Sequence, residues 1–437
     1  MTTRITLILI LTSVCAWTRA DDALYERAPI NYTTAVVRDP IARLQAKIDA
    51  AQVKLTYDPK TGYLPSLLKA LNVPVSSQVL VFSKTSFQRD LISPDHPRAL
   101  YFNDDVYIGY VQGGDVVEIS STDPNNGPIF YTLRQKRHGG ISFARQTDSC
   151  LQCHASTMTN DLPGHIVRSV YPDADGQPIL SAGTFRVNPT TPLKQRWGGW
   201  YVTGTTGEQA HMGNVFAPDK DDAERTNFAA GRNVTSLSGR VDTSPYLSPH
   251  SDVVAHMVLE HQTFVHNLIT RANFLTRLAT HDAAELNKAL GRPAGYCSES
   301  TTSRINNAVE PLVKGMLFSD EAPLTAKVAG TSAFATEFAA RGPRDGQGRS
   351  LRDFDLAGRM FVHPCSYLIY SESFDTLPAQ AKERFYVRLA EVLSGKDQSR
   401  EFAHLSTADR IAIRQILIAT KKDLPQWFAA RSAGTPG

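Results

Sequence analysis

The apolar residues of this 437-residue chain change their spacing once, and this change constrains the fold more than any other feature. Between residues 78 and 213 they form short runs separated by turn sequences such as Gly113-Gly114. Short apolar runs between turn sequences are typical of antiparallel strands. From residue 251 onward the apolar residues recur at helical spacing instead. The sequence therefore predicts an α+β protein, in which a β-rich antiparallel region is followed by an α-helical one.

The same patterns predict individual elements. Strands are expected at residues 80–82, 99–102, 106–111, 116–120, 129–133, 141–144, 165–171, 179–185 and 200–203. Helices are expected at 39–53, 64–71, 147–156, 253–278, 305–318, 351–361, 379–393 and 407–420. These elements divide the chain into an N-terminal helical segment (21–75), a β-rich domain (76–215), a polar connector (216–250) and a helical domain (251–437).

The first twenty residues have the layout of a secretory signal peptide. Arg4 precedes an apolar run at residues 5–14, and Thr18 and Ala20 provide small residues at the −3 and −1 positions of a cleavage site. Residues 1–20 are therefore expected to be removed and the protein to be exported, to the periplasm or an equivalent compartment. The apolar run is short for a membrane span, and no span is expected in the mature chain.

The charge balance argues against a nucleic-acid partner. The chain has 46 Lys and Arg residues against 43 Asp and Glu residues, a formal net charge of +3. A nucleic-acid-binding protein is expected to show a basic excess or a basic cluster. We therefore expect no nucleic-acid partner.

The strongest chemical signal is the sequence Cys150-Leu151-Gln152-Cys153-His154, a C-x-x-C-H motif. In c-type haem attachment the two thiols form thioethers with the haem vinyl groups, and the adjacent histidine binds the iron from the proximal side. Such attachment occurs outside the cytoplasm, which agrees with the expected signal peptide. The motif predicts one covalent haem c on Cys150 and Cys153, with His154 as the proximal iron ligand.

Three other interpretations of the cysteine pair remain open. A zinc site would need two further ligands at suitable spacing, and the sequence shows no matching C-x-x-C or H-x₃₋₅-H pair. A thioredoxin-like redox pair usually begins a helix in a β-α-β unit. A structural disulfide is the third possibility.

The motif resembles that of c-type cytochromes, although it covers only five residues. Three further stretches resemble a group of uncharacterised exported bacterial proteins that carry a single such motif; they are residues 101–107 (YFNDDVY), 163–172 (PGHIVRSVYP) and 196–201 (RWGGWY). This resemblance implies haem binding and electron transfer, and it adds no catalytic residue. The chain is much longer than small cytochromes c, which are compact and helical.

The sequence does not determine the second axial ligand of the iron. Met212 and His211 follow an expected strand and leave ample chain to reach the distal side of the haem. His165 is a third candidate, and an unoccupied distal position is a fourth. Methionine ligation would raise the redox potential, and a second histidine would lower it relative to methionine.

The expected long helix carries three further histidines, His256, His261 and His266. Five-residue spacing does not place successive ones on one helix face. The metalloprotease pattern H-E-x-x-H is absent. These side chains are therefore expected at the solvent or at an interface.

The two remaining cysteines of the exported chain, Cys297 and Cys365, form a possible disulfide in an oxidising compartment. The alternative is a pair of buried free thiols.

Three functions fit these observations. The first is electron transfer by a monohaem protein with a redox partner protein. The second is a haem enzyme, peroxidase-like or oxidising a small molecule, with an open distal site. The third is a haem-based sensor.

Overall fold

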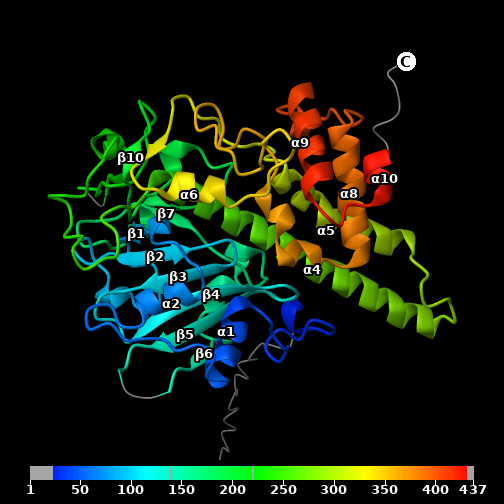
Figure 1. The fold of residues 1–437 in the computed structure, drawn as a ribbon, viewed down its shortest axis with the longest axis horizontal. Coiled ribbons are helices and arrows are strands. Elements are labelled where there is room, and N and C mark those ends of the chain that lie inside the picture. Colours follow the sequence, from blue (N-terminus) through cyan, green and yellow to red (C-terminus); the bar gives the residue numbers. More distant parts are fainter. Residues whose placement is uncertain (1–22, 138–139, 219–220, 431–437) are drawn as a thin grey trace, which may run out of the picture.

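The computed structural model describes residues 23–137, 140–218 and 221–430. The expected signal peptide at residues 1–20 lies outside the described residues. The described chain forms an antiparallel sheet in its N-terminal half and a set of helices in its C-terminal half, which confirms the α+β prediction (Figure 1).

Seven strands form one antiparallel sheet in the order β6-β5-β4-β3-β2-β1-β9. The strands are β1 (Val79–Val81), β2 (Arg98–Phe102), β3 (Val106–Tyr110), β4 (Val116–Asp123), β5 (Gly127–Arg134), β6 (Phe143–Arg145) and β9 (Trp200–Tyr201). The first six follow chain order as a meander, in which short turns connect β2 to β5 and a longer segment, residues 82–97, connects β1 to β2. β9 returns from the later chain and pairs with β1.

The β4–β5 turn also connects the sheet to the C-terminal half. Asp123 Oδ1 accepts hydrogen bonds from the backbone N–H groups of Asn125 (3.0 Å) and Asn126 (2.8 Å), which closes the β4–β5 turn. Gly127 has a φ of +66°, and a Cβ there would lie 2.4 Å from Thr270 Oγ1. A glycine at this position thus allows the hairpin to approach the helix that carries Thr270.

One face of the sheet is covered by the N-terminal helices α1 (Pro40–Asp49) and α2 (Leu64–Ala70). Asp39 caps α1, because its carboxylate accepts a hydrogen bond from the Ile41 N–H (2.8 Å). Both helices were predicted from the sequence. The C-terminal end of α1 lies four residues before the end of the expected range, 39–53.

The opposite face packs against α4 (Val253–Ala289), a 37-residue helix that crosses the middle of the molecule (Figure 1). The further helices are α5 (Glu299–Met316), α6 (Phe334–Ala340), α7 (Glu372–Asp375), α8 (Ala379–Leu393), α9 (Thr407–Thr420) and α10 (Gln426–Ala430). One continuous apolar core joins Val79 and Phe102 of the sheet to α4 and the helices beyond it. The two halves therefore share a core.

Three short elements complete the described part of the fold. They are α3 (Leu151–His154), the ribbon of β7 (Arg168–Val170) with β8 (Thr184–Arg186), and the ribbon of β10 (Gly204–Thr205) with β11 (Ala329–Gly330). The helix expected at 147–156 is thus confined to one turn.

The prediction of a helix at residues 351–361 is wrong. Phe354 and Phe361 form an antiparallel bridge, and their rings stack with centroids 5.2 Å apart. Leu356 has a φ of +57°, which a right-handed helix does not allow. The apolar residues of this segment contact other elements, so their helical spacing reflected packing rather than helix formation.

The three histidines of α4 are buried, contrary to the expectation from the sequence. His256, His261 and His266 are 1%, 0% and 1% exposed. The reason is that α4 is covered by the sheet region on one side and by the other helices on the other. Periodicity within one helix does not reveal how many sides its neighbours will cover.

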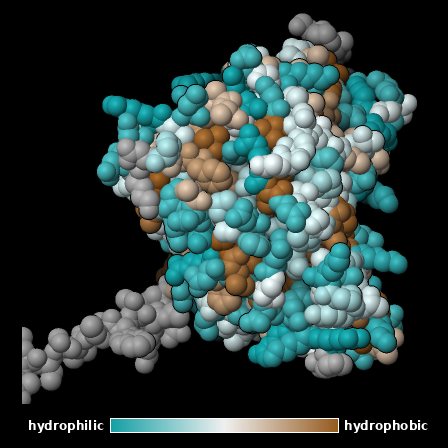
Figure 2. Space-filling view, turned by 90° about the vertical axis from the view of Figure 1, so that its left-hand side faces the viewer, coloured by the Kyte–Doolittle hydropathy of each residue, from teal (hydrophilic) through white to brown (hydrophobic). Residues whose placement is uncertain are grey.

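Among the described residues, no helix is both long enough and apolar enough to cross a bilayer. On the face seen in Figure 2, hydrophilic residues predominate and the apolar residues form small, separate patches.

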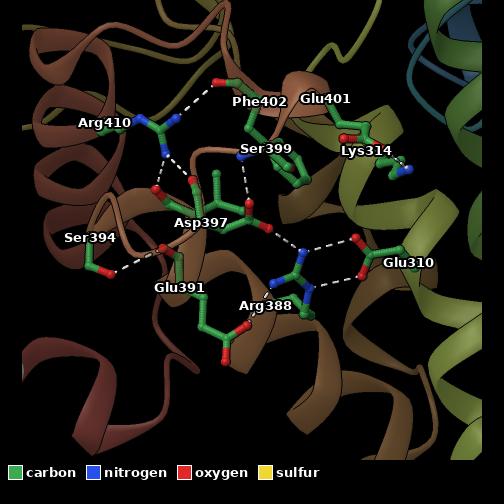
Figure 3. A network of polar contacts seen from close by, with 11 residues as sticks. Glu310, Lys314, Arg388, Glu391, Ser394, Asp397, Ser399, Glu401, Phe402 and Arg410 are labelled. Atoms are coloured by element: carbon green, nitrogen blue, oxygen red, sulfur yellow. Dashed lines mark hydrogen bonds and ion pairs between the residues drawn. The ribbon is translucent and has the colours of Figure 1, made fainter.

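Arg388 connects its own helix, α8, to α5 and to the loop that follows α8 (Figure 3). Its guanidinium binds both carboxylate oxygens of Glu310 on α5 at 2.9 and 3.0 Å, and it also binds Glu391 (2.6 Å) and Asp397 (2.7 Å). The hydrogen bond from Arg388 is the main reason that the pKa of Asp397 falls to about 2. These bonds fix α8 against α5.

We expect Arg388→Met to lower the free energy of unfolding by about 2 kcal/mol at pH 7, because three carboxylates would then face one another without a cation. Urea unfolding followed by circular dichroism measures the change. Arg304→Met is the matched control, since the Arg304 side chain is 45% exposed and, among the described residues, pairs with Asp282 alone. A loss no larger than that of the control would contradict this role for Arg388.

Candidate functional site

The C-x-x-C-H motif lies on α3, between the sheet and the loop that follows it. Cys150 is the N-terminal cap residue of α3 and is half-buried, and Cys153 is exposed one turn later. Both are free thiols. Burial raises the pKa of the Cys150 thiol to about 11, with a smaller contribution from the Glu118 carboxylate. The Cys150 thiol is therefore protonated at neutral pH, and the Cys153 thiol lies one helical turn further along the chain.

His154 ends α3 and is held in one orientation. Its Nδ1 lies 2.8 Å from the carbonyl oxygen of Gly164, and the Gly164 N–H donates to the His154 carbonyl at 2.8 Å. The ring packs against Phe130 of β5, with centroids 4.6 Å apart. Nδ1 therefore carries the proton and donates it to Gly164, and no described residue hydrogen-bonds to Nε2. An imidazole fixed in this way offers Nε2 to a metal.

The loop that holds His154 is itself fastened to α4. Asn267 Oδ1 accepts a hydrogen bond from the His165 N–H at 2.7 Å, and Asn267 Nδ2 donates to the His165 carbonyl at 2.8 Å. Because Gly164 precedes His165, one side chain of α4 fixes the position of the carbonyl that orients His154. Sequence reasoning missed Asn267, and no local signal in the sequence identifies it.

Gly164 has no room for a side chain. A Cβ at this position would lie 2.9 Å from both Asn267 Oδ1 and Thr159 Cγ2. We expect Gly164→Ala to destabilise the protein by about 1–3 kcal/mol, because the loop must move away from α4. Urea unfolding measures the loss.

Gly295→Ala is the matched control, since a Cβ at Gly295 would meet nothing within 4 Å. We expect this change to be neutral or slightly stabilising. Equal stability of the two variants would show that Gly164 tolerates a side chain, and would contradict the close packing of the loop.

His165, one of the residues predicted as a second ligand, lies beside His154. It is 6% exposed, its ring packs on Tyr107 with centroids 4.4 Å apart, and its Nδ1 lies 3.4 Å from Ser120 Oγ. Ser120 is paired with Phe130 across β4 and β5, so the supports of the two imidazoles are neighbours on one sheet face. Burial lowers the pKa of His165 well below its usual value.

The other two predicted ligands, His211 and Met212, lie elsewhere. Met212 Sδ accepts a hydrogen bond from Ser169 at 3.6 Å, and His211 packs on Trp197, which also contacts His256. His256 is eleven residues before Asn267 on α4, so the two regions are separated by roughly 16 Å along the helix. The structure brings His165 to His154 and does not bring His211 or Met212 there.

Cys297 and Cys365 are both free thiols in the structure. Cys297 is exposed just before α5 begins, whereas Cys365 is buried at the other end, where the next residue, Ser366, bonds to the Met316 carbonyl at 2.7 Å. The 18 residues of α5 span about 27 Å, and a disulfide needs Cα atoms within about 7 Å. The expected disulfide is therefore not formed.

An ion pair lies close to the motif on the same sheet face. Arg98 Nη2 on β2 is 2.7 Å from Glu118 Oε2 on β4, and both side chains are largely buried. Gly109 lies between them on β3 and provides the space, since a Cβ there would lie 2.1 Å from Arg98 Nη2. Alternation along β2 and β4 places both side chains on this face, but the sequence does not show that α3 lies above them.

An open cleft of about 600 Å³ lies apart from the motif. Its lining is polar and includes Lys84, Asp95, Asp175 and Arg240. None of the motif residues lines it.

Comparisons with protein-family models, with curated proteins and with solved structures find no match to this chain. The chemistry of the donor set fits a covalent haem, because Cys150 and Cys153 are free thiols and His154 has its Nδ1 engaged. Zinc coordination is less well supported, since the described residues contain no group of three or more His, Cys, Asp or Glu side chains arranged to hold a metal ion.

Proposed function

We propose that this chain is an exported c-type haem protein that transfers electrons through a single covalent haem. Cys150 and Cys153 would hold the haem through thioethers, and His154 would be the proximal iron ligand. The observation that carries the proposal is the hydrogen bond from His154 Nδ1 to the Gly164 carbonyl, beside two free thiols. This bond is the arrangement that fixes the tautomer of an iron-binding histidine.

The bound haem would supply a one-electron iron couple. The residues around it have separate tasks. The Gly164 carbonyl holds the His154 proton on Nδ1 and makes the imidazole a stronger donor. Phe130 restricts rotation of the ring. Cys153 lies at the surface, which places its attachment point where a redox partner protein can approach.

Covalent attachment is tested by expressing the full chain with cytochrome c maturation factors. A haem-peroxidase stain on a denaturing gel and a pyridine haemochrome spectrum are expected to report one haem per chain. Cys153→Ala is expected to lose one thioether and to weaken or abolish the stain. Cys297→Ala, which removes an exposed thiol outside the motif, is the matched control and should stain as the parent does.

A parent protein that is matured with its factors and still carries no haem would overturn the proposal. The cysteine pair would then have to be tested as a disulfide or as a pair of metal ligands.

Electron transfer is separated from catalysis by a second measurement. We expect a potentiometric titration to show one reversible one-electron couple, and the reduced protein to be reoxidised by a small soluble cytochrome. Turnover of hydrogen peroxide with an electron donor, at a rate well above that of free haem, would favour an enzyme instead.

A further inference from the structure

His165 carries a buried nitrogen that nothing in the described structure satisfies. Nε2 is sealed from solvent and has no hydrogen-bond partner among the described residues. An unsatisfied buried polar atom of this kind destabilises the folded state, so such atoms are uncommon in native proteins unless a ligand or water completes their hydrogen bonding.

The other atoms of His165 are held in place. The Asn267 side chain binds both its backbone N–H and its carbonyl, and Ser120 Oγ lies 3.4 Å from Nδ1. The Ser120 hydroxyl oxygen can accept a proton from Nδ1, and in that tautomer the lone pair is on Nε2. Tyr107 supports the ring from the sheet. The side chain is therefore oriented for a contact made through Nε2 alone.

This arrangement repeats that of His154. Each imidazole has Nδ1 beside an oxygen atom, each packs on an aromatic ring of the same sheet face, and each leaves Nε2 without a protein partner. Both also depend on the same two-residue segment, because Gly164 orients His154 and is followed directly by His165. Two imidazoles that are held in the same way, one by Gly164 and the other in the next residue, suit a single metal between them.

Met212 and His211, the other two ligands predicted from the sequence, each accept a hydrogen bond. Met212 Sδ accepts a hydrogen bond from Ser169, and His211 Nδ1 accepts one from the Gly213 N–H at 3.1 Å. Both residues are buried beside Trp197, away from α3. His266, the other histidine near His165, donates from Nε2 to the Asp104 carbonyl at 2.8 Å, and its ring centroid lies 6.0 Å from that of His165.

We propose that His165 is the second axial ligand of the haem iron and binds through Nε2. The inference rests on the proposed function, since it assigns the distal side of the same haem. Iron ligated by His154 and His165 would be six-coordinate and low-spin, with a lower potential than a haem ligated by histidine and methionine.

The test uses the haem-bearing full chain and four variants. The ferric parent is expected to show the electron paramagnetic resonance spectrum of low-spin bis-imidazole iron, to lack the near-infrared band of sulfur ligation, and to bind no CO when reduced. His165→Ala is expected to become high-spin and to bind CO stoichiometrically, and added imidazole should restore the low-spin spectrum. His165→Met, which keeps a ligand of similar volume, should gain the sulfur band.

Met212→Leu and His211→Gln are the controls and should remain low-spin without CO binding. A haem-bearing parent whose low-spin spectrum survives in His165→Ala would overturn the ligand assignment, as would a high-spin spectrum in Met212→Leu or His211→Gln. A parent that already binds CO stoichiometrically would also overturn it. Absence of covalent haem in the parent is recognised separately by the stain, and it would remove the proposed function together with this inference.

Discussion

Replacing Arg196 by methionine is expected to destabilise the protein by about 3–5 kcal/mol at pH 8. Arg196 Nη1 lies 2.9 Å from Glu260 Oε2 of α4, and its Nε and Nη2 donate to the carbonyls of Thr191 (2.8 Å) and Pro189 (2.9 Å). The two charged side chains are 5% and 1% exposed. The variant would leave a buried carboxylate without its cation and the Thr191 carbonyl without its arginine donor, whereas the Pro189 carbonyl would keep the hydrogen bond from the Ala322 N–H.

The loss is expected to depend on pH. Burial raises the pKa of Glu260 from 4.5 to about 7, although Arg196 opposes this shift. A raised pKa favours folding when the group is protonated and disfavours it as pH rises through the folded value. Without Arg196 this pKa rises further, so the destabilisation should be smaller at pH 6 than at pH 8.

Urea unfolding at pH 6 and pH 8 measures the loss of stability. Arg232→Met is the matched control. Arg232 pairs with Glu208, whose side chain is 93% exposed, and its loss should cost less than about 1 kcal/mol. The double variant Arg196→Met/Glu260→Gln should recover part of the loss, because no buried charge remains. Similar losses for Arg196→Met and Arg232→Met would show that the buried pair contributes little.

The second large effect concerns acid stability and His261. This side chain is fully buried in α4, it stacks on Phe318 with centroids 4.3 Å apart, and its Nε2 lies 2.8 Å from Ser366 Oγ. Burial lowers its pKa from 6.5 to about 3, with a smaller contribution from His266. Below pH 6.5 the unfolded chain therefore binds a proton that the folded chain does not. The stability that neutral His261 contributes is present above pH 6.5 and is lost as pH falls towards 3.

We expect His261→Gln to remove this loss. The parent should lose about 1.4 kcal/mol of stability per pH unit below 6.5 from this residue, or about 2 kcal/mol at pH 5. Unfolding free energies of the two proteins, measured in urea from pH 7 to pH 5, should therefore converge by that amount. His96→Gln is the control, because His96 is exposed in the folded chain and should leave the parent's profile unchanged. Parallel profiles for the parent and His261→Gln would contradict the burial of this ring.

The fold could be predicted from the sequence wherever the local spacing of apolar residues determined whether a segment forms a strand or a helix. The short apolar runs gave six strands of the meander, and α8 and α9 have the predicted bounds. The pattern failed at residues 351–361, where helical spacing arose from aromatic contacts between distant elements. It also failed to show that α4 is covered on both sides, since burial depends on neighbours rather than on the helix.

The candidate site divides in the same way. Cys150, Cys153 and His154 were identified because their chemistry is encoded in five consecutive residues. The residues that orient them are distant in sequence, and Asn267 follows His165 by 102 positions. His165 was one of several candidates in the sequence, and only its unsatisfied Nε2 and its place beside His154 distinguish it from Met212 and His211.

The attachment of the motif loop to α4 has a consequence for the order of folding. Asn267 follows His154 by more than a hundred residues, so the contacts that orient the imidazole close a loop of about that length. Long-range contacts of this kind form late, because the entropy of loop closure must be overcome first. A nascent chain that ends before α4 contains both thiols and lacks their anchor. The motif therefore stays accessible on the growing chain and becomes rigid only when the second half of the protein has folded against it.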